Sequence, residues 1–123
     1  MCHWNIIYTK GFRHEHTRPD REDYIKFQNR THNGCYVDNY EAHLFENVDT
    51  YGYNYDYCSV MHYSARSSSC IMTPKQNISC TVQGQTVTYM GQRLGMSETD
   101  IQEVNSRYDC VPGKNMLFTG LFL

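Results

Sequence analysis

The sequence predicts a small α+β domain that consists mostly of loops and carries a capped helix near its C-terminus. Residues 97–108 combine a helix start signal with helical periodicity. Residues 71–89 contain two short runs typical of β-strands, and most of the remaining chain is polar and rich in turn-forming residues. A chain of 123 residues is long enough for one such domain.

The predicted helix has the clearest boundaries of any element. Ser97 stands at its N-cap and Asp100 follows three residues later, which makes a capping box with Asp in place of Glu. Apolar and aromatic residues then recur at helical spacing, so we expect the helix to dock through the face formed by Ile101, Val104, Asn105 and Tyr108. Cys110 follows the helix and could pin its end.

The other elements are shorter. One strand is expected around Ile71 and Met72, and another over residues 86–89 after a turn at Gln83-Gly84. Residues 11–24 are dense in His, Arg and Asp, which indicates an ordered loop. A short helix or strand could begin within residues 20–26, a helical turn is expected within residues 40–48, and Asn33-Gly34 predicts a turn.

The composition indicates a modest core that needs covalent support. Aliphatic residues are sparse and the mean hydropathy is −0.66. Six cysteines suit an oxidising compartment, so we expect a secreted protein, in keeping with the sequons Asn29-Arg30-Thr31 and Asn77-Ile78-Ser79. Many pairings of the cysteines are possible. The first guess is Cys70 with Cys80, and the next is Cys35 with Cys58.

Charge and hydropathy argue against two classes of partner. The net charge of −2, without a basic block, does not suit a nucleic-acid partner. No apolar run is long enough to predict a membrane span. Residues 1–10 lack the charged start and long apolar run of a signal peptide, which predicts that the true start of this secretory-looking protein lies elsewhere.

Three segments carry candidate chemistry. The first is residues 11–21, where His14 follows Gly11 and could point back at a preceding helix. The second is residues 59–63, a Ser-Val-Met-His-Tyr cluster, and the third is residues 91–110. Taken singly, a histidine in a His-Glu-His loop is more often a salt-bridged or surface residue than a metal ligand, and a methionine such as Met61 is usually a core residue.

Together the three segments resemble the astacin family of zinc metalloendopeptidases. Residues 11–21, Gly-Phe-x-His-Glu-x-x-Arg-x-Asp-Arg, are similar to the segment that closes its zinc motif, H-E-x-x-H-x-x-G-x-x-H. Residues 59–63 look like the methionine turn of these metzincins, and residues 91–110 resemble the C-terminal helix and final cysteine. The resemblance implies the lower, C-terminal subdomain of a metzincin-like protease domain. It divides the chain into an unmatched segment 1–10, a partial peptidase domain 11–110 and an unmatched tail 111–123.

The resemblance implies a role for individual residues. His14 matches the third zinc ligand, and Met61 matches the methionine beneath the metal. Tyr63 matches the tyrosine that can ligate zinc as an auxiliary ligand and can also stabilise the transition state. Glu15 matches the glutamate that receives the trimmed N-terminus of the mature enzyme. Cys110 matches the cysteine bridged to the N-terminal subdomain. The implied cofactor is zinc, and the implied partner is a peptide or protein substrate.

The resemblance fails before Gly11. In the register set by Gly11, Trp4 and Tyr8 stand where the first two zinc histidines belong, and Asn5 stands where the catalytic glutamate belongs. His3 is one residue out of register. A catalytic zinc normally needs three protein ligands and a water, and its reaction needs a general base. His16 or His62 could add only a weak ligand, so we expect weak zinc binding at best and no peptide hydrolysis.

Three interpretations of the whole chain remain open. The first is a truncated member of an active peptidase family, which the abrupt change at Gly11 favours because drift in a functionless protein would scatter changes throughout. The second is an inactive homologue that serves as a secreted binding module. The third is a small cysteine-stapled structural domain without a site.

Overall fold

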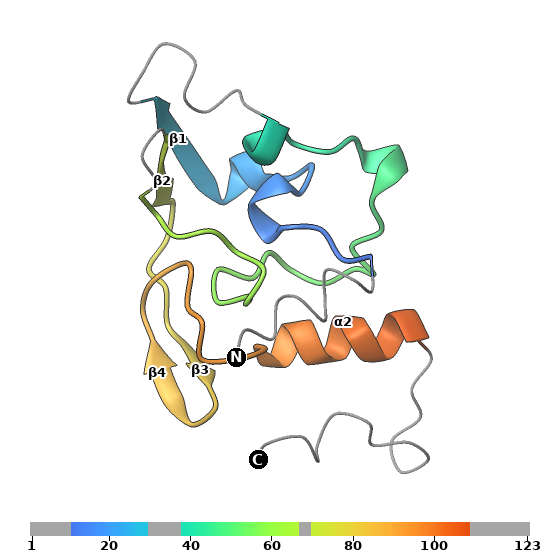
Figure 1. Ribbon diagram of the computed structural model, residues 1–123, viewed down its shortest axis with the longest axis vertical. Helices are drawn as coiled ribbons and strands as arrows, with labels where there is room; N and C mark the ends of the chain where they lie inside the picture. The colour runs from blue at the N-terminus through green and yellow to red at the C-terminus, as the bar shows by residue number, and fades with distance from the viewer. Residues whose placement is uncertain (1–10, 30–37, 67–69, 109–123) are drawn as a thin grey trace.

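The structure is a computed structural model that describes residues 11–29, 38–66 and 70–108 (Figure 1). Its regular elements are short and are joined by long loops, which confirms the predicted α+β class. They are the 3-10 helices η1 (Glu15–Thr17), η2 (Arg21–Asp23), η3 (Asp38–Tyr40) and η4 (Phe45–Asn47), the strands β1 (Ile25–Asn29), β2 (Cys70–Pro74), β3 (Cys80–Val82) and β4 (Gln85–Val87), and the helix α2 (Glu98–Tyr108).

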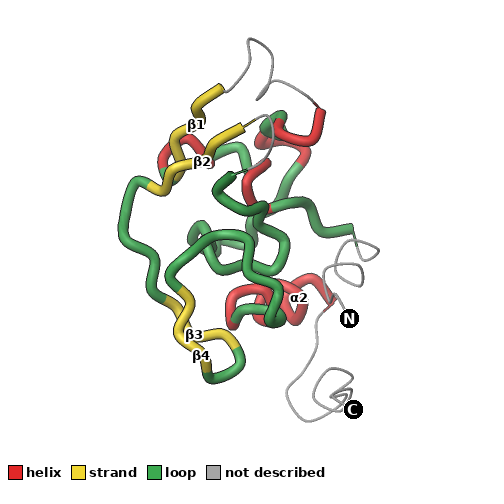
Figure 2. Tube along the Cα trace, turned by 60° about the vertical axis from the view of Figure 1, so that its left-hand side comes forward, coloured by secondary structure: helices red, strands yellow, loops and turns green. Residues whose placement is uncertain are grey.

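The strands form two separate antiparallel pairs. β1 pairs with β2 across a long sequence gap, from Ile25 opposite Pro74 to Asn29 opposite Cys70. β3 and β4 form a hairpin in which Val82 faces Gln85. Figures 1 and 2 both show these two pairs at one side of the molecule, with loops between them and α2. The expected strand around Ile71 and Met72 is therefore confirmed as β2.

The hairpin turn follows from its two central residues. Gln83 and Gly84 have φ values of 49° and 76°. Two successive residues with positive φ are typical of the type I′ turn, whose twist matches that of the flanking strands. The turn expected at Gln83-Gly84 is confirmed, whereas the strand after it runs over Gln85–Val87 rather than residues 86–89, and β3 adds a strand that we did not predict.

The upstream elements resolve the ambiguity of the sequence patterns. Residues 20–26, where a short helix or a strand was expected to begin, contain the start of both. η2 ends at Asp23 and β1 begins at Ile25. η4 supplies the helical turn expected within residues 40–48. The core joins β1 and β2 to the aromatic loop, the tyrosine-rich residues 51–57 before the methionine turn. Its buried side chains come from Ile25, Tyr40, Tyr55, Tyr57, Cys70, Met72 and Met90.

Helix α2 keeps its predicted cap but not its predicted buried face. Ser97 N donates to Asp100 Oδ2 at 2.8 Å, and Asp100 N donates to Ser97 Oγ at 2.9 Å, so the capping box forms in both directions. Of the four residues expected to dock, only Val104 is buried, and Ile101 is 42% exposed. The prediction of that face was wrong because the helix docks through its buried cap carboxylate as well as through an apolar side chain.

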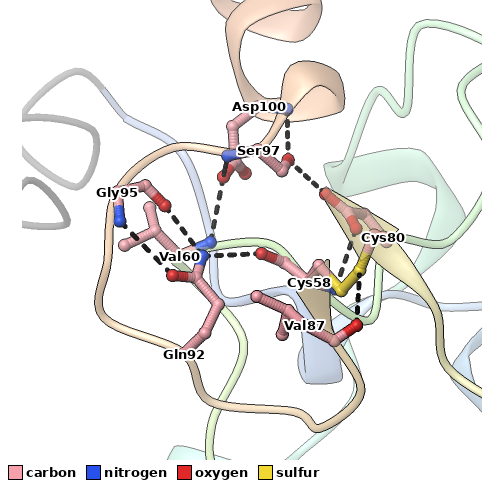
Figure 3. The surroundings of a disulfide bond; sticks show 9 residues. Cys58, Val60, Cys80, Val87, Gln92, Gly95, Ser97 and Asp100 are labelled. Carbon is pink, nitrogen blue, oxygen red and sulfur yellow. Dashed lines mark hydrogen bonds between the residues drawn. A yellow bond between two sulfur atoms is a disulfide. The ribbon is translucent and has the colours of Figure 1, made fainter. Parts of the chain in front are cut away.

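The cysteine pairing also differs from the first guess. Cys58 is bonded to Cys80, with Cα atoms 6.6 Å apart, so neither Cys70–Cys80 nor Cys35–Cys58 forms. Cys70 is itself disulfide-bonded. Figure 3 shows the Cys58–Cys80 bond tying the start of β3 to the methionine-turn segment. A short sequence loop was a poor guide here, because Cys70 and Cys80 belong to different strand pairs.

Several predictions fall outside the described residues. They concern the segment 1–10, the Asn33-Gly34 turn, Cys110 and the tail 111–123. Among the helices of the described part, none combines the length and apolar character that crossing a membrane requires.

Candidate functional site

His14 is positioned by the turn that opens η1. Gly11 has a φ of 84°, which favours glycine and turns the chain into this segment. His14 has extended backbone and precedes η1, where its carbonyl accepts from Thr17 N at 2.9 Å and Thr17 Oγ1 at 2.6 Å. The next residue, Glu15, donates its N–H to Met61 O at 3.4 Å. The backbone of the predicted zinc ligand is therefore tied to the predicted methionine turn.

The methionine turn brings Tyr63 to His14. A backbone bond from His62 N to Ser59 O, 3.1 Å long, closes the turn. Met61 is 3% exposed and packs with Val60, while Tyr63 lies half-buried. The ring centroids of His14 and Tyr63 are 4.6 Å apart in an edge-on arrangement. The fold thus brings together residues from two separate segments.

Asp100 holds this turn against the start of α2. Its carboxylate accepts from Ser59 Oγ at 2.6 Å. It also accepts from Val60 N at 2.9 Å and from Ser97 N at 2.8 Å (Figure 3). Burial raises the pKa of Asp100 to about 6, while the bond from Ser59 opposes the rise. The sequence predicted Asp100 as part of the helix cap, but nothing in its local pattern indicated that it also forms hydrogen bonds with the methionine turn.

Gln92 supports the same turn from the other side. Its amide nitrogen donates to Cys58 O and Gly95 O, each at 2.7 Å. Its amide oxygen accepts from Leu94 N at 2.8 Å. In Figure 3 the Gln92 side chain lies between Cys58 and Gly95. Gln92 is 1% exposed, and this full use of its hydrogen-bonding groups explains why a polar side chain is buried there.

Glu15 is buried in an ionic network rather than exposed beside the histidine. Its Oε1 accepts from Arg18 Nη1 at 3.1 Å and from Asp56 N at 2.8 Å. Arg18 also donates Nε and Nη2 to the two carboxylate oxygens of Asp20, at 3.0 and 2.8 Å. Burial raises the pKa of Glu15, and the Arg18 guanidinium opposes that rise. Paired in this way, Glu15 fixes η1 to the aromatic loop.

His62 uses both ring nitrogens within the protein. Nδ1 lies 2.6 Å from Tyr63 O, which can only accept, so Nδ1 carries the proton. Burial lowers the pKa of His62 to about 4, so the ring is neutral near pH 7 and Nε2 accepts from Tyr55 O–H at 2.7 Å. With both nitrogens engaged, His62 does not supply the weak extra ligand considered from the sequence.

His16 has one ring nitrogen that the described residues leave without a hydrogen-bond partner. It is fully buried, and its Nε2 lies 2.9 Å from Asn39 O, which fixes the proton on Nε2. Nδ1 has no hydrogen-bond partner among the described residues. Burial lowers the pKa of His16 to about 3. Its ring centroid is 5.5 Å from that of His14 and 4.1 Å from that of Tyr63.

A cavity of about 220 Å³ opens beside His14. Its lining includes Glu15 and Glu103, together with Arg18 and Arg107. Burial raises the pKa of Glu103 to about 7, and the negative charge of Asp100 adds to the rise. The cavity is therefore lined by both the segment around His14 and helix α2, which contributes Glu103 and Arg107.

The described residues do not fit a catalytic zinc ion by themselves. No group of three or more His, Cys, Asp or Glu side chains within the described ranges could hold a metal. The predicted ligands found there are His14 and Tyr63, whereas a catalytic zinc takes three protein ligands and a water. No catalytic step through zinc follows from these residues.

Comparison with known proteins places this arrangement in a family. The family model for astacin, a peptidase family, matches residues 1–109. An astacin-like metalloendopeptidase of Coturnix japonica is 35% identical in an alignment of 116 residues, which covers 89% of this chain and 27% of that protein. The zinc metalloproteinase nas-13 of Caenorhabditis elegans is 33% identical over 85% of this chain and 22% of its own length.

A solved structure agrees with the fold. High choriolytic enzyme 1, a hatching enzyme zinc-protease from Oryzias latipes, superimposes with a TM-score of 0.59 at 30% identity, over 81% of this chain and 47% of that one. The chain thus spans about a quarter of the length of the relatives matched by sequence and about half of the length of the solved structure. The names of the relatives agree with zinc as the family's cofactor. The chain belongs to the astacin family of zinc metallopeptidases and corresponds to the C-terminal portion of their catalytic domain.

Proposed function

We propose that this chain is a partial astacin-type zinc metalloendopeptidase domain that does not hydrolyse peptides by itself. The observation that carries the proposal is the contact between the rings of His14 and Tyr63, within a described region that offers no three-ligand group. Met61, in the same turn as Tyr63, is buried. In the register of Gly11, the remaining motif positions hold Trp4, Asn5 and Tyr8.

The roles proposed for the site residues follow the family pattern. His14 is the third zinc ligand, Tyr63 is the auxiliary ligand and transition-state tyrosine, and Met61 and Glu15 support the site. The general base is absent because Asn5 occupies its place. The proposed division is a segment 1–10 without the zinc-motif residues, a partial peptidase domain 11–110 and a tail 111–123. The family model matches residues 1–109.

The proposed setting is extracellular, and the proposed partner is a peptide or protein. The Cys58–Cys80 disulfide supports an oxidising compartment. The family's peptidase activity supports peptide or protein substrates for the intact domain. The second candidate is an inactive homologue that acts as a secreted binding module, which the cavity beside His14 favours because a binder needs a formed cavity but no catalytic base.

Zinc content tests the proposal directly. The purified chain, dialysed against zinc, is expected to retain far less than one zinc ion per molecule and to show no chelator-sensitive hydrolysis of an unstructured protein substrate. Near-stoichiometric zinc that is lost in the His14→Ala variant, together with such hydrolysis, would contradict the proposal. A saturable complex of the zinc-free chain with a peptide would favour the binding module.

Restoring the motif tests the register. The triple variant Trp4→His, Asn5→Glu, Tyr8→His supplies the two missing ligands at i, i+4 spacing together with the base. It is expected to bind about one zinc ion with three histidine ligands. The matched control carries Gln instead of Glu at position 5 and should bind zinc equally while lacking the base. A triple variant that binds no more zinc than the parent chain would show that the register is wrong.

A further inference from the structure

We propose that Asn77 is a site of N-linked glycosylation. Asn77-Ile78-Ser79 is an acceptor sequon without proline at its middle position. The inference rests on the secreted setting proposed above, but it does not depend on zinc binding or peptidase activity. The structure adds what the motif alone lacks, namely the placement of each sequon residue.

The sequon lies in the connection between β2 and β3, and its outer residues face solvent. Asn77 and Ser79 are exposed, and residues 77–79 belong to no helix or strand. Ile78 instead packs against two hydrophobic clusters, one containing Met72 and the other containing Val82. Because the middle residue is directed inward, the acceptor amide and the hydroxyl are presented outward, as a bulky surface modification requires.

The Asn77 side chain is available for modification. Within the described residues it makes no hydrogen bond, so attachment of a glycan breaks no interaction there. The loop is held at both ends: Lys75 N donates to Tyr24 O at 2.8 Å, and Cys80 is bonded to Cys58. A glycan would therefore project from a loop whose two ends are fixed to the rest of the fold.

A glycan at this position leaves the cavity beside His14 open. The lining of that cavity comes from residues 11–51 and from Glu103 and Arg107, and none of it comes from the connection between β2 and β3. Figures 1 and 2 show this connection running along the outer edge of the molecule between the two strand pairs. Modification of Asn77 is thus compatible with any ligand of the cavity.

The second sequon is placed differently. Asn29 is the last residue of β1, and its backbone pairs with that of Cys70, which is disulfide-bonded. The rest of that sequon, residues 30 and 31, lies outside the described ranges. Among the described residues, the sequon of Asn77 is therefore the one whose three positions are all placed.

The reaction is a glycosyl transfer from a lipid-linked donor. The donor is an oligosaccharide joined through its anomeric carbon to a polyisoprenyl diphosphate, and the enzyme is the oligosaccharyltransferase of the secretory compartment. A bond forms between Asn77 Nδ2 and the anomeric carbon. The bond from that carbon to the diphosphate oxygen breaks, the diphosphate leaves with the electron pair, and Nδ2 loses one proton.

The test is expression of the full chain behind a cleavable secretion leader in a eukaryotic cell. Protein recovered from the medium is expected to show increased electrophoretic mobility after treatment with peptide N-glycosidase, and Asn77 should be converted to Asp in the peptide map. In the variants Asn77→Gln and Ser79→Ala, the change in electrophoretic mobility on enzyme treatment should be smaller by the amount that one glycan causes. The controls Ser79→Thr, which keeps the sequon, and Asn29→Gln should retain modification of Asn77.

An unmodified Asn77 peptide in the secreted wild-type protein would overturn the inference, even if Asn29 carried a glycan. Because that readout uses the wild-type chain, it does not depend on the folding of any variant. Zinc content and hydrolysis, measured on the same protein after removal of glycans, test the proposed function separately. Either proposal can therefore fail while the other stands.

Discussion

Asp100 shows how one buried carboxylate can serve two structures at once. It caps α2 through Ser97 and also accepts from the side chain of Ser59 and the backbone of Val60. Charge-assisted hydrogen bonds of this kind are stronger than neutral ones, and leaving buried donors unpaired is costly. At the residue scale, the methionine turn therefore depends on Asp100 as well as on its own side chains.

Replacing Asp100 by Asn tests that dependence. The amide keeps the shape of the side chain, but its NH2 group replaces one carboxylate oxygen. This NH2 group can only donate, and the neighbouring groups at that position are also donors. We expect the free energy of unfolding to fall by about 2–3 kcal/mol. Chemical denaturation measures it, and the matched control is Glu98→Gln in the exposed first turn of the same helix, which should change stability by less than about 0.5 kcal/mol. Equal effects of the two variants would refute the role of Asp100.

Glu103 gives a pH-dependent prediction. Its pKa rises from an unfolded value near 4.5 to about 7, chiefly through burial. The folded state therefore binds the proton more tightly than the unfolded state, and this stabilisation is present below pH 4.5 and lost as the pH rises through 7. We expect Glu103→Gln to stabilise the protein by about 2 kcal/mol at pH 8 and to have little effect at about pH 4.5.

Unfolding curves of the Glu103→Gln variant at both pH values check this sign. The comparison variant is Glu46→Gln, because Glu46 is exposed on η4. It should show no comparable difference between the two pH values. A stabilisation by Glu103→Gln that is larger at the acidic pH than at the alkaline one would reverse the argument.

At the scale of elements, the turns depend on two glycines with similar backbone conformations but different surroundings. Gly84, in the hairpin turn, has a φ of 76°, and a Cβ there would meet nothing within 4 Å. Gly91, which follows the core residue Met90, has a φ of 84°, and a Cβ there would lie 2.6 Å from Ser64 N. Ser64 directly follows Tyr63, so the close approach at Gly91 helps to place the tyrosine of the site.

Substituting alanine at each glycine separates conformation from contact. Both variants carry the left-handed backbone penalty of about 1–2 kcal/mol, and we expect Gly84→Ala to cost no more than that. Gly91→Ala must also displace the Ser64 backbone, so it is expected to cost at least about 1 kcal/mol more. Thermal or denaturant unfolding of the pair gives the difference. Equal losses would mean that Ser64 moves freely and that the contact at Gly91 does not constrain the site.

For the whole molecule, the Cys58–Cys80 bond compensates for a small aliphatic core. It closes a segment with a sequence separation of 22, and removing it is expected to lower the free energy of unfolding by about 3 kcal/mol. The variants Cys58→Ser, Cys80→Ser and the double variant should lose similar amounts, because each breaks the same bond. Calorimetry or denaturant unfolding measures the three. If the double variant instead lost the sum of the two single losses in free energy of unfolding, each thiol would contribute to stability independently of the disulfide.

The sequence predicted the parts of the fold that local chemistry determines. The capping box at Ser97 and the turn at Gln83-Gly84 were found because their residue types encode the backbone conformation. The approach of His14 to Tyr63 was expected only through the family resemblance. The docking face of α2 and the Cys58–Cys80 pairing were missed, because both depend on partners about 20 to 40 residues away in the chain. Likewise, no pattern around Gln92 indicated that it would be buried.

The double attachment of Asp100 has a kinetic consequence. An isolated helix of eleven residues is marginal in water. The first turn of α2 is capped by the carboxylate of Asp100, which is also bound to Ser59 and Val60. Helix and methionine turn are therefore stabilised by the same event, although some forty residues separate them. In the folding transition state, α2 and the methionine turn should therefore be either both formed or both absent.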